Sequence, residues 1–136
     1  MPVTHANSPT RDAMCNAVVG LVDQGSALAS GRLQLSVDSG FTDVVVSVPL
    51  QNPAFAVASA GSGTSALNTG GGLSVVYSGG VTKTVNYFRF TDRDGVEVMR
   101  GTVSGPSGTG DMKLADNVIP DNTTITVTAF VYTTIP

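Results

Sequence analysis

Side chains that carry out chemistry are scarce in this sequence. Its 136 residues include no tryptophan, one histidine and one cysteine, and only 12% of them are charged. The single thiol excludes an internal disulfide and suits synthesis in a reducing bacterial cytoplasm. Glu97 is the only glutamate, so no pair of acids for glycosidic cleavage is evident, and His5 has no nucleophile or orienting carboxylate near it in the sequence. We therefore predict a protein that is not an enzyme and that uses no cofactor.

The charge pattern excludes two further kinds of partner. The seven Lys and Arg residues are scattered and the formal net charge is -3, so no basic patch for nucleic acid is expected. The longest helical candidate contains Arg11, Asp12 and Asp23, which argues against a membrane span. The first residues show no secretory pattern of a basic region before an apolar core. A polar surface with few charges is easily buried against another protein, which favours a role in assembly.

The hydrophobic spacing divides the chain into an arm and one domain. Residues 1–8 are polar, without a period, and we predict an extended N-terminal arm. Residues 9–136 have the length of a single β-rich domain. It begins with a helix from about Thr10 to Gln24, on which Cys15 is expected to be a buried, unpaired thiol. The apolar stripe of this helix consists of Met14, Val18, Leu21 and Val22.

After the helix, apolar residues recur at every second position, which predicts strands. Asp94-Gly95 lies between two such runs and is a strong hairpin signal. We predict a mainly β fold, an antiparallel β-sandwich or small barrel of about seven strands, with the helix over one face or open end. Residues 51–72, rich in glycine, are predicted to be a long contact loop. The expected strands are 33–37, 44–50, 73–77, 82–90, 96–103, 111–114 and 124–134.

The order of these elements resembles a family of small virion proteins of tailed bacteriophages. The similarity is carried by the helix at residues 11–23, the segment 53–56, the hairpin at residues 88–103 and the closing strand at residues 124–132. The resemblance implies a capsid decoration (cement) protein on the capsid exterior of the virion, with the major capsid protein as partner. It also implies that copies of the chain associate with one another, with a homotrimer as the expected form. The residues expected to contact a partner are Pro2, Val3, Thr4, His5, Asn7, Phe55, Asp92 and Arg93.

Two other interpretations were weighed for the same residues. A carbohydrate or receptor-binding module on a head or tail fibre would use the 51–72 loop and the hairpin tip at residues 92–95. A calcium site would use Asp92, Asp94 and Asp111, but apolar residues follow where a calcium loop needs oxygen ligands. We therefore predict a hairpin turn there and no metal.

Overall fold

One α-helix, one short 3₁₀ helix and eleven strands form the described part of the chain, residues 8–70 and 72–134 of a computed structural model. Helix α1 and the 3₁₀ helix η1 come first, and every strand follows them. The mainly β fold with one N-terminal helix is thus as predicted. The elements are α1 (Ser8–Gly20), η1 (Leu21–Asp23), β1 (Arg32–Ser36), β2 (Val44–Pro49), β3 (Thr64–Ala66), β4 (Leu73–Tyr77), β5 (Lys83–Thr84), β6 (Tyr87–Thr91), β7 (Glu97–Ser104), β8 (Met112–Lys113), β9 (Val118–Ile119), β10 (Thr123–Val127) and β11 (Val131–Thr133).

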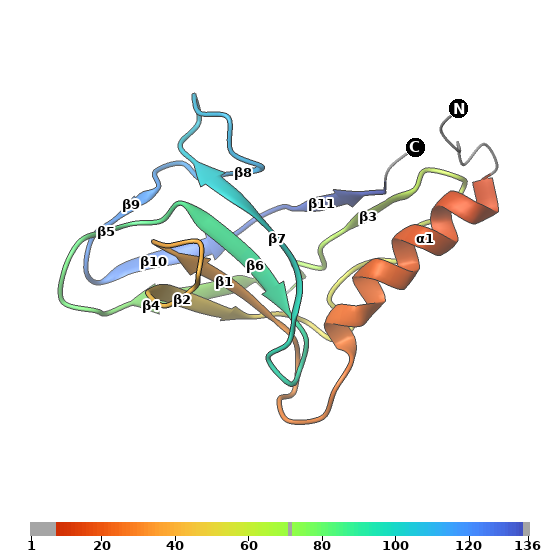
Figure 1. Ribbon diagram of the computed structural model, residues 1–136, viewed down its shortest axis with the longest axis horizontal. Coiled ribbons are helices and arrows are strands. Elements are labelled where there is room, and N and C mark those ends of the chain that lie inside the picture. Colours follow the sequence, from red (N-terminus) through yellow and green to blue (C-terminus); the bar gives the residue numbers. More distant parts are fainter. Residues whose placement is uncertain (1–7, 71, 135–136) are drawn as a thin grey trace.

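A curled five-stranded sheet, in the order β2-β1-β6-β7-β8, forms most of the molecule (Figure 1). The pair β10-β4 packs against it, so the arrangement is sandwich-like and the core lies between the two sheets. Successive side chains of a strand point to opposite faces, so Leu33 and Leu35 of β1 both point inward. Val46 and Val48 of β2 are buried with them. The two sheets come side by side at β2 and β4, but no backbone ladder joins these strands in the described residues.

An aromatic cluster connects the centre of the sheet to distant segments. Phe90 on β6 is fully buried and lies 5.5 Å, ring centroid to ring centroid, from Phe55 and 5.0 Å from Phe130. Phe88, two residues earlier on the same face of β6, lies 5.7 Å from Phe130. Most of these rings meet edge to face, the favourable geometry for aromatic pairs. Segments before β3 and before β11 are held to the sheet in this way.

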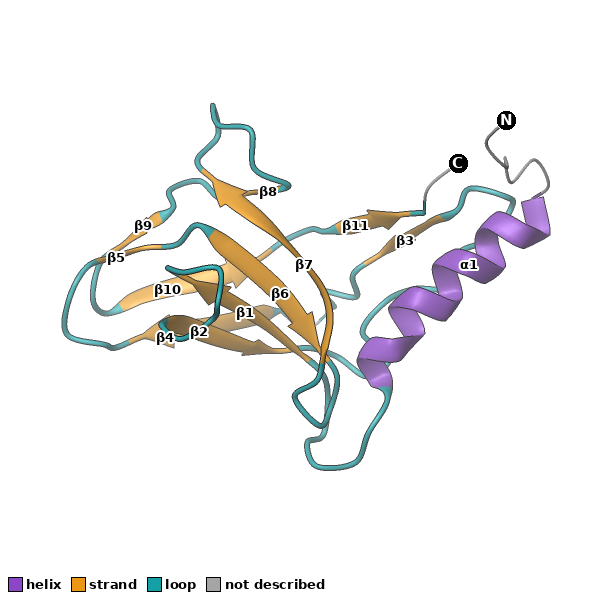
Figure 2. Ribbon diagram, in the orientation of Figure 1, coloured by secondary structure: helices purple, strands orange, loops and turns teal. Residues whose placement is uncertain are grey.

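The helix and the pair β11-β3 form a lobe that projects from one side of the sheets (Figure 2). Val19 near the C-terminal end of α1 and Val22 of η1 belong to the core, whereas the N-terminal part of α1 runs beside the β3-β11 ribbon. We refer to α1, η1, the ribbon and the loop at residues 54–63 as the helical lobe. It closes one end of the core and leaves much of its own surface exposed.

Several boundaries differ from the sequence prediction. The 51–72 segment is not a continuous loop, because β3 pairs with β11 and Phe55 forms a bridge with Leu67. The strands predicted at 82–90 and 124–134 are each divided in two, and β9 was not predicted. The helix starts at Ser8, so the last residue of the predicted arm is helical. Residues 1–7 lie outside the described residues.

The buried stripe of the helix is also not the predicted one. Cys15, Val19 and Val22 are buried, whereas Met14 and Val18 are half-buried and Leu21 is 51% exposed. Both sets have helical spacing, so spacing alone did not select the buried one. Gly25 follows the helix at φ 99°, and a Cβ there would lie 2.6 Å from the Asp94 carboxyl carbon, so the turn requires glycine.

The structure generates a prediction for Cys15, the only thiol of the chain. Its side chain is 0% exposed, and burial, with the charge of Asp12 as a second cause, raises its pKa. We expect a thiol reagent to label the native protein much more slowly than an Ala29→Cys variant, whose added thiol lies in an exposed loop. In urea both thiols should react rapidly. Equally fast labelling of Cys15 in native protein and in urea would contradict its burial.

Candidate functional site

A cleft of about 530 Å³ opens where β2 and β4 lie side by side without a ladder. Its lining includes the consecutive residues 43–47 from one strand and 75–79 from the other, with Val81 and Lys83. Successive side chains of a strand point to opposite faces, so consecutive lining residues mean that the cleft opens on strand edges. It therefore presents backbone polar groups and valine side chains to whatever enters it.

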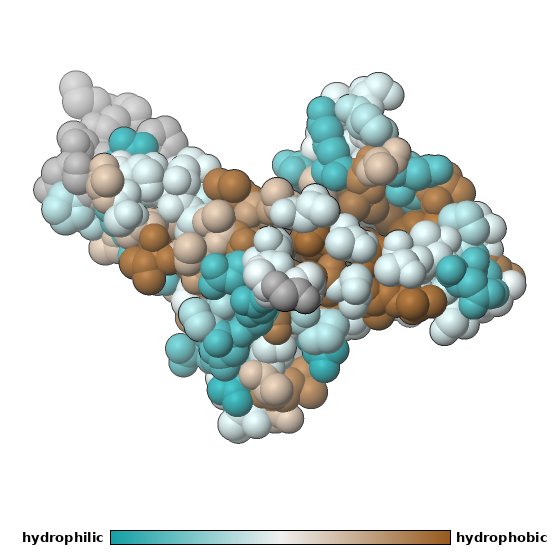
Figure 3. Space-filling view, turned by 180° about the vertical axis from the view of Figure 1, so that it is seen from behind, coloured by the Kyte–Doolittle hydropathy of each residue, from teal (hydrophilic) through white to brown (hydrophobic). Residues whose placement is uncertain are grey.

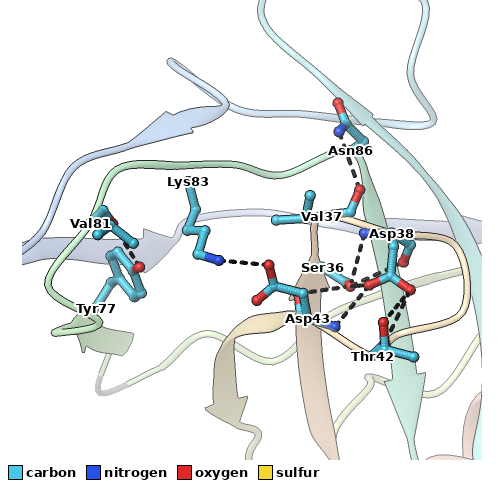
Figure 4. Close-up of polar contacts among 9 residues, drawn as sticks. All are labelled: Ser36, Val37, Asp38, Thr42, Asp43, Tyr77, Val81, Lys83 and Asn86. Carbon is cyan, nitrogen blue, oxygen red and sulfur yellow. Dashed lines mark hydrogen bonds and ion pairs between the residues drawn. The ribbon is translucent and has the colours of Figure 1, made fainter.

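Polar side chains at the rim of the cleft are hydrogen-bonded within the chain (Figure 4). The Lys83 ammonium donates a 2.7 Å hydrogen bond to the Asp43 carboxylate, and this bond raises the pKa of Lys83. The Tyr77 hydroxyl donates to the Val81 carbonyl at 2.7 Å. A lysine that is held protonated is neither a nucleophile nor a general base. The polar side chains Lys83, Asp43 and Tyr77 of this rim are thus bonded within the chain.

Asp38 organises the loop that carries Asp43 to the rim. Its carboxylate accepts hydrogen bonds from the backbone N–H groups of Asp43 and Thr42 and from the hydroxyls of Thr42 and Ser36. The two backbone bonds are the main reason that the pKa of Asp38 lies well below its usual range. Such a side-chain cap of a turn fixes the loop between β1 and β2.

The same loop places Phe41 on the outer face of the sheet in an unusual conformation. Phe41 has φ 55°, which is rare for a bulky residue. Its ring lies 4.5 Å from the Arg89 guanidinium carbon and 5.4 Å from that of Arg100, and Glu97 pairs with both arginines. Cation–π contacts and the Asp38 turn together offset the strain of this backbone.

Three of the predicted contact residues, Phe55, Asp92 and Arg93, fall within the described part of the chain. Phe55 is 4% exposed and packs in the aromatic cluster, so its side chain has almost no surface for a partner, contrary to the expectation. Asp92 and Arg93 lie at the tip of the β6-β7 hairpin and are half-buried. The other expected contact residues, Pro2, Val3, Thr4, His5 and Asn7, lie outside the described residues.

The hairpin predicted from Asp94-Gly95 is present, and its tip is bound to the chain itself. The Asp92 carboxylate accepts the N–H groups of Asp94 and Val96, and Gly95 has φ 83°. The Asp94 carboxylate accepts two N–H groups of the loop before β1, which lower its pKa. Arg93 donates to the carbonyl of Leu28 in that loop. The tip therefore fastens the helix-to-sheet connection.

The described residues contain no group of three His, Cys, Asp or Glu that could hold a metal ion. Asp94 binds the loop before β1, whereas Asp111 accepts the backbone N–H and hydroxyl of Thr102 on β7. The three aspartates weighed as a calcium site thus serve separate backbone turns and connections. The described helices are too short or too polar to cross a bilayer.

Comparisons with known proteins add no relative to this description. No protein-family model, curated protein or solved structure shows detectable similarity to the chain. The cleft was also missed from the sequence. Asp38 and Thr42, four residues apart, could have indicated the capped turn, but no local signal shows that β4 lies beside β2.

The Asp38 turn generates a prediction about pH dependence. The pKa of the Asp38 carboxyl is lower in the folded than in the unfolded chain. The charged carboxylate therefore contributes its full stabilisation of the fold at pH values above the unfolded pKa of about 4. That contribution is lost progressively as the pH falls from there through the folded pKa. We expect Asp38→Asn to lower the urea midpoint at pH 7 and to differ less from wild type at pH 3. An equal difference at both pH values would contradict this linkage.

Proposed function

We propose that the protein is a non-enzymatic structural protein of a tailed-phage virion, which decorates and stabilises the outer surface of the capsid. The major capsid protein would be its partner, and copies of the chain would associate with one another, as a homotrimer in the simplest arrangement. Repeated docking of a symmetric oligomer on a symmetric shell multiplies weak contacts.

The observation that carries this proposal is the distribution of apolar and charged groups on the described surface. Many of its charged side chains are already bonded within the chain, as at Asp38, Asp94 and Lys83. Apolar side chains are exposed instead, and contact with a partner would bury them at little cost in desolvated charge. The large exposed apolar residues are Leu21, Leu28, Val57, Val76, Val81, Val96, Val118 and Val131.

The cleft gives less support to the alternative, a carbohydrate or receptor-binding module. Sugar sites commonly offer an exposed aromatic face to the ring. Tyr77 is the one aromatic residue of the cleft, and it is buried with its hydroxyl bonded to Val81. The hairpin tip, the other surface that a receptor would use, is bound to the helix-to-sheet connection.

The proposal predicts that heads of the encoding phage withstand heat better when they carry the protein. We expect purified heads saturated with it to rupture several degrees higher than bare heads, because it binds the assembled lattice better than free subunits. A variant lacking residues 1–7 tests the predicted arm and should bind more weakly.

Serum albumin added at equal concentration controls for non-specific protection. Equal rupture temperatures for bare and saturated heads would refute the decoration role. Unchanged binding of the shortened variant would remove only the arm from the interface.

A further inference from the structure

Asp12 and Asn16 of α1 and Asp23 of η1 bond to the loop at residues 54–63. The Asp12 carboxylate accepts the N–H groups of Gly61 and Gly63 at 2.8 and 3.0 Å. Asn16 accepts the N–H of Ala58 at 2.7 Å and donates to its carbonyl. At the other end, the Asp23 carboxylate accepts a backbone N–H at 2.9 Å. Between these two aspartates the sequence has no charged residue.

What the helix presents outward is therefore uncharged. Ala13, Ala17 and Leu21 are exposed, and Met14 and Val18 border them. We call these five residues the outward helix face. A helix that faces water normally carries charged residues on that side, and one that is apolar on several sides is normally buried. Among the described residues, the centre of the outward helix face, Ala13, Ala17 and Leu21, is exposed, and Met14 and Val18 are half-buried at its border.

We infer that the outward helix face binds a second copy of this chain. Met14 and Val18 of α1 and Leu21 at the start of η1 are spaced by four and then three residues, the spacing of apolar residues where two helices pack along each other. Each chain carries a net charge of -3, so two copies repel except where they meet through uncharged surface. The outward helix face is such a surface, and it avoids like-charge contact between copies.

The area of the outward helix face indicates how much more of the lobe a contact between two copies must include. The 13 residues of α1 make a helix about 20 Å long, and a strip about 10 Å wide along it buries roughly 200 Å² per copy. A stable interface buries about 800 Å² per partner. The remainder must come from the rest of the helical lobe, where Val57 is 79% and Val131 58% exposed. In the view from behind, brown and beige patches lie among pale and teal atoms at this end of the molecule (Figure 3).

The β3-β11 ribbon gives a structural reason for this contact. Each of its strands has three residues, and an isolated two-stranded ribbon is marginally stable in water. Within the chain it is flanked by α1 and by residues 55–56, which bond to Ser65 and Ala66 of β3. A second lobe would cover the helix from the other side and complete a small core. This self-association does not depend on capsid binding.

Sedimentation equilibrium of the full chain tests the inference. We expect wild type to be oligomeric and Ala17→Glu to weaken self-association roughly 100-fold, because the added carboxylates would face one another without water. Ala29→Glu adds the same charge in an exposed loop outside the lobe and should leave association unchanged. A monomeric wild type, or equal association of the two variants, would overturn the inference.

Cross-linking decides the matter if Ala17→Glu fails to fold. Ala17 lies near the middle of the helix, so a parallel or an antiparallel partner brings two copies of this position close together. Treatment of Ala17→Cys with a short bismaleimide should yield covalent dimers, whereas Ala29→Cys should not, and the buried native Cys15 should stay unreacted. No dimer from Ala17→Cys, or equal yields from both variants, would overturn the inference and leave the capsid proposal untouched.

Discussion

The packing of Phe90 against Phe55 and Phe130 is the contact on which the rest of the structure depends. Phe90 lies at the centre of the five-stranded sheet, and the other two rings come from segments 75 residues apart in the chain. These segments lead into β3 and β11, so the aromatic contact brings the two strands of the ribbon together. The ribbon in turn supports α1. Truncation of such a buried ring to alanine typically costs about 3–5 kcal/mol, a large part of the stability of a small domain.

Short polar turns set the geometry around this core. Asp38, Asp92 and Asp94 each accept backbone N–H groups, and each fixes a connection that hydrophobic packing alone would leave variable. Several of the few charged side chains are therefore bonded to backbone groups of surface loops and shape them. This use of the few aspartates explains how a chain with 12% charged residues retains defined loops while it presents valine and alanine outward.

The β2-β4 cleft and the helical lobe both leave surface uncovered, but they differ in how that surface is protected. The β2-β4 cleft exposes strand edges between two sheets, but its rim is occupied by the Lys83–Asp43 pair and β2 ends at Pro49, which protects an edge from pairing. The helical lobe has no comparable protection. Its outward helix face is uncharged and has no ion pair at its border among the described residues, so the lobe offers a second copy an apolar surface that the cleft does not.

Local pattern determined the helix, the alternating strands β1 and β2 and the Asp94-Gly95 hairpin, because each depends on residues close together in the sequence. Tertiary structure alone decided the partner of β3, which is about 65 residues away, and the burial of Phe55. It also decided which apolar stripe of α1 turned inward, since Cys15-Val19-Val22 and Met14-Val18-Leu21 have the same spacing. Periodicity specifies that a face is apolar, whereas long-range packing selects which apolar face the chain itself buries and which one it leaves exposed.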